Sequence, residues 1–151
     1  NNTLHRVLND RADFKKNELI KLVEDKKIKK VVICSGKIYF DLLKAREKNK
    51  NKNVFIIRIE QLYPFPVKTL AKVLKRFRKK SEFFWCQEEP KNMGAWNTVR
   101  NYIQWSLDYI KAENKEVNYV GRKPAASPAS GYLKKHLAEQ NEILEKVIGK
   151  F

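Results

Sequence analysis

The sequence has few of the residues that usually build metal sites and disulfide frameworks. Its 151 residues include two cysteines, Cys34 and Cys86, two histidines and one methionine. The cysteines lack Cys-x-x-Cys spacing and two histidines cannot form a cluster, so the sequence does not predict a metal site. Each cysteine ends an apolar run, which indicates buried thiols in a reducing compartment. A disulfide between the two cysteines stays open as an alternative.

Long apolar segments are also absent. The strongest apolar runs, such as residues 31–34 and 54–57, are far shorter than the roughly 20 residues that a membrane helix needs. The first residues lack the apolar segment of a signal peptide, so we expect no membrane association. Because the chain begins with Asn1 and its only methionine is Met93, we expect it to be part of a longer polypeptide.

Acidic residues are scarce relative to basic ones. The sequence contains 33 lysines and arginines against 17 aspartates and glutamates, a formal net charge of +16. This charge suits an acidic protein, an anionic membrane surface or a nucleic acid. The lysines are, however, spread over almost every predicted helix, and the densest basic stretch, residues 75–80, ends a helix, where cations stabilise exposed carbonyls. Trp85, Trp96 and Trp105 are predicted as core or interface residues. A basic nucleic-acid-binding α/β module stays an alternative function.

Apolar runs and helical stripes alternate along most of the chain. A lead-in segment, residues 1–30, is expected to hold a short helix over 14–25. From residue 31 onward, continuous or β-branched runs predict strands at 31–34, 54–59, 82–86 and 117–120. Stripes of helical period predict helices beginning near residues 38, 66, 95 and 128. Ser127 is expected to cap the last helix, whose stripe consists of Leu133, Leu137, Gln140, Leu144 and Val147. Residues 87–93 are predicted as a loop.

This alternation predicts an α/β fold of three layers, in which helices flank a mainly parallel sheet. The crossover between the first two strands contains a helix, so these strands should be parallel neighbours or near neighbours. We expect residues 31–151 to form a single domain that follows the lead-in.

Polar residues follow the predicted strands where ligands collect in such folds, beyond the carboxyl ends. Ser35, Gly36 and Lys37 could hold an anion or could simply form a tight turn, and the upstream glycine of a phosphate-binding loop is missing. A Gly36→Val change should destabilise the turn by backbone strain and crowding. The other residues at or next to these ends are Arg58, Ile59, Glu60, Gln61, Gln87, Glu88, Glu89, Gly121 and Arg122.

The charged members of this set, Arg58, Glu60, Glu88, Glu89 and Arg122, are expected to cluster and to meet a neighbouring domain or an anionic effector. Glu88 and Glu89 could form an acid/base pair, although neighbouring residues at a strand end usually point apart, which favours a structural or interface role. His136 has no partner from which a catalytic triad could be assembled, so a packing or interface role is favoured for it.

Three longer strings resemble one enzyme family. They are Ile57-Arg-Ile-Glu-Gln-Leu-Tyr-Pro-Phe-Pro66, Trp85-Cys-Gln-Glu-Glu-Pro-Lys-Asn-Met-Gly-Ala-Trp96 and Tyr119-Val-Gly-Arg-Lys-Pro-Ala-Ala-Ser-Pro-Ala-Ser-Gly131. Together with residues 31–43 and His136, they are similar, in the same order, to the thiamine-diphosphate-dependent decarboxylase component of 2-oxoglutarate dehydrogenase. The resemblance covers about residues 31–148, whereas residues 1–30 depart from the family pattern except near Arg6.

The resemblance implies a C-terminal domain similar to that of transketolase. The whole enzyme would be an oxidoreductase of the tricarboxylic acid cycle, in a multienzyme complex. It would use thiamine diphosphate and Mg²⁺ to decarboxylate 2-oxoglutarate and would pass the succinyl group to the lipoyl arm of the acyltransferase component. The related 2-oxoadipate branch stays open. The location would be cytoplasmic in a bacterium and the mitochondrial matrix in a eukaryote.

Within that family, the domain would contribute dimer contacts, support the upstream domains and border an effector site. No Gly-Asp-Gly occurs among the five glycines, so no cofactor-binding, metal or catalytic residue is expected in this chain. The candidate effector or interface residues are Ser35, Gly36, Lys37, Arg58, Glu60, Gln61, Glu88, Glu89, Arg122 and His136.

Overall fold

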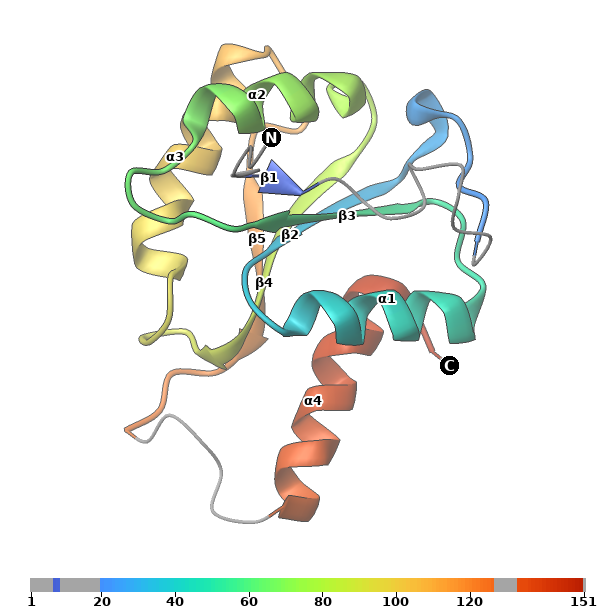
Figure 1. Cartoon of the computed structure of the whole chain (residues 1–151), viewed down its shortest axis with the longest axis vertical. Coiled ribbons are helices and arrows are strands. Elements are labelled where there is room, and N and C mark those ends of the chain that lie inside the picture. Colours follow the sequence, from blue (N-terminus) through green and yellow to red (C-terminus); the bar gives the residue numbers. More distant parts are fainter. Residues whose placement is uncertain (1–6, 9–19, 127–132, 151) are drawn as a thin grey trace, which may run out of the picture.

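A computed structural model describes residues 7–8, 20–126 and 133–150 of the chain. Its elements are β1 (Val7–Leu8), the 3₁₀ helix η2 (Asp25–Lys27), β2 (Lys30–Cys34), α1 (Ile38–Asn49), β3 (Val54–Ile59), α2 (Val67–Leu74), the 3₁₀ helix η3 (Lys75–Phe77), β4 (Glu82–Pro90), α3 (Trp96–Tyr109), β5 (Val117–Arg122) and α4 (Leu133–Ile148). The strands form one sheet in the order β1-β3-β2-β4-β5 (Figure 1). β2 to β5 are parallel, and β1 pairs with β3 in the antiparallel sense.

Helices cover both faces of the sheet, which confirms the predicted three-layer α/β fold. α2 and α3 lie on one face, where their apolar side chains meet Ile33, Ile57 and Trp85. α1 and α4 lie on the other face, over Val32, Cys34 and Ile56 (Figure 1). Side chains on neighbouring strand positions point to opposite faces, so an unbroken apolar run such as Val31–Cys34 supplies both cores. β2 and β3 are parallel neighbours, as the crossover predicted.

The lead-in differs from its prediction. Residues 20–24 are not helical, and only Asp25–Lys27 form a short 3₁₀ helix; residues 14–19 of the predicted helix lie outside the described part. The apolar side chains of Leu22 and Val23 still pack on the core, because the Val23 N–H donates to the Lys52 carbonyl at 2.9 Å and holds an extended segment against the sheet. Ile28 is fully buried, and β1 extends the sheet. The described lead-in residues therefore share the core of the domain.

Two further predictions change at the C-terminal half. Residues 87–90, predicted as part of a loop, continue β4 and pair Pro90 with Arg122 beyond an irregularity in the ladder. Of the apolar residues predicted for the α4 stripe, Leu144 and Val147 are buried, whereas Leu133 and Leu137 are exposed, because the first half of α4 extends away from the sheet (Figure 1). The predicted cap, Ser127 before Pro128, lies outside the described residues.

Cys34 and Cys86 occupy paired positions on β2 and β4, and both are free thiols buried in the core. No helix within the described ranges is both long enough and apolar enough to cross a membrane.

Candidate functional site at the carboxyl edge of the sheet

The carboxyl edge of the sheet is the edge at which the parallel strands β2 to β5 end. Its first part is the turn after β2. Gly36 has φ +83°, a backbone conformation that side chains disfavour, and α1 begins two residues later. The Ser35 hydroxyl donates to the Ile59 carbonyl at 3.0 Å, so it joins the end of β2 to the end of β3. A Cβ atom added at Gly36 would meet nothing within 4 Å. The turn therefore needs glycine for its backbone angle, and the predicted crowding is absent.

Arg58 and Glu60 meet at the end of β3. Arg58 Nε lies 3.1 Å from Glu60 Oε1, and the guanidinium also lies 5.2 Å from the ring centre of Phe40 on α1. The amide of Gln61 donates instead to the Pro64 carbonyl at 3.1 Å. Arg58 and Glu60 thus form one local pair beside α1, while Gln61 shapes the turn that leads to α2.

Arg122 fastens α4 to the end of β5. Its Nε lies 3.0 Å from Glu139 Oε2, and its Nη2 lies 2.9 Å from His136 Nδ1. Because a guanidinium only donates, Nδ1 is the acceptor, and a neutral His136 carries its proton on Nε2. The structure therefore brings together Arg122 and His136, which are 14 residues apart, and adds Glu139, which the sequence analysis did not select.

Glu88 is held by a second residue of α4. The Gln140 amide donates to Glu88 Oε1 at 3.1 Å and to Asp41 Oδ2 of α1 at 3.3 Å. One side chain thus joins β4, α1 and α4. Gln140 Oε1 is buried and accepts no hydrogen bond from a described residue. The predicted helical stripe included Gln140, but its spacing alone did not reveal this junction.

Glu89 points away from this group. Its carboxylate lies in the turn before α3, where Oε2 would be 3.1 Å from a Cβ added at Gly94. Glu88 contacts α4 on the opposite side of the sheet. The two glutamates are therefore not arranged as an acid/base pair, and Glu89 does not join Glu88 and Arg122 on the side of the sheet that α4 covers.

Gln87, which the sequence analysis placed in a loop at the end of a strand, is buried. Its Oε1 accepts from Trp85 Nε1 at 2.9 Å and from the Trp96 N–H at 3.1 Å. Its Nε2 lies 2.9–3.1 Å from the carbonyls of Glu89, Pro90 and Met93. Since a buried amide needs partners for every polar atom, Gln87 fixes the path from β4 to α3. In the sequence, the feature that could have pointed to Gln87 is its position inside the Trp85–Trp96 string.

Burial raises the pKa values of three side chains beneath the carboxyl edge. Desolvation raises the pKa of the Cys86 thiol to about 12 and raises that of Cys34 well above its usual value, with the charge of the neighbouring cysteine adding to the effect on Cys34. Burial also raises the pKa of Tyr119 to about 12. Protonated, inaccessible thiols are poor nucleophiles, so these cysteines are structural.

The donor set does not suit thiamine diphosphate with Mg²⁺. Among the residues described, no three His, Cys, Asp or Glu side chains gather into a set that could hold a metal ion. The chain also lacks Gly-Asp-Gly, and the carboxylates of Glu60, Glu139 and Glu88 at the carboxyl edge already contact Arg58, Arg122 and Gln140, respectively. The described edge can join elements and present a surface, but it offers no cradle for this cofactor.

Comparisons with known proteins agree with the three strings of the sequence. Residues 1–148 match the family model described as 2-oxoglutarate dehydrogenase C-terminal. The chain is 51% identical over 147 residues to proteins named "2-oxoglutarate dehydrogenase E1 component" from Brucella anthropi and Brucella ovis, and 50% identical to that of Brucella abortus.

These alignments cover 97% of this chain but only 14–15% of each relative. Because the family match starts at residue 1, the expectation that residues 1–30 depart from the family pattern was wrong. The match over residues 1–148 places the chain in the 2-oxoglutarate dehydrogenase C-terminal family.

Proposed function

We propose that this chain is the C-terminal domain of a 2-oxoglutarate dehydrogenase E1 component and that it supports the enzyme without performing the chemical step. The observation that carries the proposal is the 51% identity, over 97% of the chain, to relatives with that name. The whole enzyme, an oxidoreductase, would decarboxylate 2-oxoglutarate and transfer the succinyl group to the lipoyl arm of the acyltransferase component. Thiamine diphosphate would supply the carbanion stabilisation for decarboxylation.

The carboxyl edge supports a structural role. Arg122, His136 and Glu139 join β5 to α4, and Gln140 joins α4 to β4 and α1. Side chains fixed in this way give the edge a defined shape, which an interface requires. We propose that this edge meets the upstream domains of the same polypeptide and contributes to a homodimer.

An anionic effector is the second ligand proposed for the edge. Lys37 is exposed next to the Gly36 turn, and Arg58 lies at the end of the adjacent strand, so both cations could contact one anion. As further effector or interface residues at this edge we propose Ser35, Gly36, Glu60, Gln61, Glu88, Glu89, Arg122 and His136; the carboxylates among them would serve the interface. Since the relatives named above are bacterial, we propose a cytoplasmic enzyme.

The test compares the full-length protein with the 151-residue chain. With thiamine diphosphate, Mg²⁺ and 2-oxoglutarate, the full-length protein should release CO₂, and the isolated chain should not. Parallel reactions with 2-oxoadipate decide the substrate branch. Turnover by the isolated chain would contradict the supporting role, and a full-length protein that uses only 2-oxoadipate would contradict the substrate.

One variant distinguishes a supporting role of Arg122 from a catalytic role. Arg122→Ala in the full-length protein should lower thermal stability or dimer content, while the intact fraction keeps its kcat. A fully folded, dimeric Arg122→Ala enzyme with a kcat reduced more than tenfold would place Arg122 in the chemical step and refute the proposed division.

A further inference from the structure

The outer side of α3 carries a stripe of exposed aromatic side chains. Tyr102, Trp105 and Tyr109 are 41%, 47% and 69% exposed. Their spacing of three and four residues places them on one side of the helix. Trp85 and Trp96, by contrast, are buried, so Trp105 is the tryptophan that faces solvent. Exposed aromatic side chains grouped on one side of a helix are typical of interaction sites.

Ring stacking holds the stripe in a fixed shape. Trp105 and Tyr109 stack with ring centres 5.0 Å apart and planes 10° apart. Phe65, from the turn before α2, stacks on Tyr102 with the same 5.0 Å separation and a 7° angle. Side chains that are already ordered lose little conformational entropy when a partner binds. The stripe is therefore a preorganised apolar surface.

A cationic ridge runs beside this stripe. Residues 67–80, which form α2, η3 and the turn that follows, include no aspartate or glutamate. Their exposed cations are Lys68, Lys72, Lys75, Arg78, Lys79 and Lys80. Since all six are cations on one segment, the ridge has a single sign of charge.

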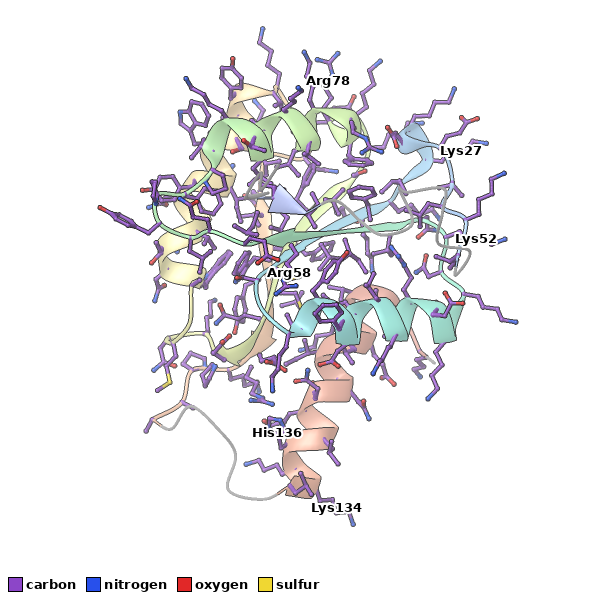
Figure 2. The ribbon with its side chains drawn as sticks, in the orientation of Figure 1. Lys27, Lys52, Arg58, Arg78, Lys134 and His136 are labelled. Atoms are coloured by element: carbon purple, nitrogen blue, oxygen red, sulfur yellow. The ribbon has the colours of Figure 1, made fainter. Side chains whose placement is uncertain are left out.

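Contacts at both ends place the ridge along the stripe. The Phe65–Tyr102 stack joins the start of α2 to α3. The Glu113 N–H donates to the Arg78 carbonyl at 2.8 Å and joins the end of η3 to the chain just past Tyr109. In Figure 1, α2 and α3 lie together on the same side of the sheet, and Figure 2 shows Arg78 at the far end of the molecule from Lys134 on α4. Aromatic residues and arginine beside a charged rim are typical of protein interfaces.

We propose that the aromatic stripe and the cationic ridge form one docking surface for an acidic polypeptide that carries exposed apolar side chains. An acidic partner is favoured because its negative charge complements the cationic ridge. A second copy of this chain, in a twofold contact, would set one cationic ridge against the other, which costs free energy. The partner's carboxylates would meet the lysines, and its apolar side chains would cover Trp105 and Tyr109.

A nucleic acid fits this surface less well. Bases bind by stacking on free aromatic faces, whereas Trp105 and Tyr109 already stack on each other. The observations therefore favour a polypeptide, and the experiment includes nucleic acid as a separate outcome.

Site-specific photo-crosslinking in the full-length protein, within the cells that make it, tests the proposal. p-Benzoylphenylalanine replaces Tyr109, and the control protein carries it in place of Lys134. Crosslinked peptides from position 109 should contain more aspartate and glutamate than lysine and arginine. Adding Lys72→Glu and Lys75→Glu should reduce that yield at least tenfold. Crosslinks to residues 1–151 of a second copy, crosslinks to nucleic acid, or a yield no higher than at position 134 would each overturn the proposal.

A binding measurement with the 151-residue chain provides an independent readout. The probe is a random copolymer of glutamate and tyrosine. Single-stranded DNA of equal charge is tested as the alternative ligand. The copolymer should protect Trp105 from acrylamide quenching, and Lys72→Glu with Lys75→Glu should weaken binding at least tenfold. The matched pair, Lys134→Glu with Lys135→Glu, should change binding less than threefold. Equal losses for both pairs, or tighter binding of DNA at this surface, would refute the proposed partner. Neither experiment depends on decarboxylase activity.

Discussion

Replacing Gln87 with alanine tests the link between β4 and α3. Gln87 is 3% exposed, and its Oε1 is the acceptor for Trp85 Nε1 and for the Trp96 N–H. An alanine leaves both donors buried without this partner, at about 1–3 kcal/mol for each. It also removes the amide that three carbonyls share. We expect a total loss of about 3–5 kcal/mol in the free energy of unfolding, which is a large part of the roughly 5–15 kcal/mol of a typical domain.

Urea unfolding followed by circular dichroism measures this loss. For a domain of this size, the same change should lower Tm by roughly 6–20 °C. Gln61→Ala is the matched control, because Gln61 donates one hydrogen bond at an exposed turn and its loss should cost less than about 1 kcal/mol. If Gln87→Ala costs no more than Gln61→Ala, Gln87 does not hold the β4–α3 connection.

Three further changes test the carboxyl edge and the core. Gly36→Ala should lower stability by about 1–2 kcal/mol through its positive φ alone, and Gly36→Asn by less; equal Tm values for alanine and glycine would contradict this. Arg122→Ala should cost about 1–3 kcal/mol, and hydrogen exchange should rise first in α4; unchanged protection there would exclude Arg122 as its anchor. The third change is in pH. The folded-state pKa values of Cys86 and Tyr119 are raised to about 12, so their contribution is complete below pH 9 and is lost as pH rises toward 12. A thiol reagent at pH 8 should therefore label Cys34 and Cys86 only in urea, and rapid labelling of the native protein would show that they are accessible.

The sequence predicted the strands of the parallel sheet because their patterns are local. Val31–Cys34 and Val54–Ile59 are apolar at nearly every position, which only a strand covered on both faces requires. The turn at Gly36 was predictable for the same reason, since a strand must turn into a helix within three residues. The strings that identify the family are also properties of the sequence alone.

Local patterns failed where a segment's partner is distant in the chain. Leu22 and Val23 lie three and four residues after Leu19, a helical spacing, yet a hydrogen bond to Lys52 and contacts with the core hold the segment at Leu22 and Val23 extended. Leu133 and Leu137 continue the stripe of α4, but no described part of the sheet reaches them. Sequence spacing reports which face a residue occupies and not whether anything covers that face.

Side-chain junctions of the site were decided by the tertiary structure. Arg122 meets Glu139, and Gln140 joins Glu88 to Asp41, although Asp41 and Gln140 are 99 residues apart. Glu88 and Glu89 are adjacent in sequence but lie on opposite sides of the sheet, because successive strand residues alternate. The amino-acid sequence thus determined the elements, their order and the family. Only the tertiary packing of the helices and strands determined which polar groups meet, since buried polar groups must find partners wherever the fold places them.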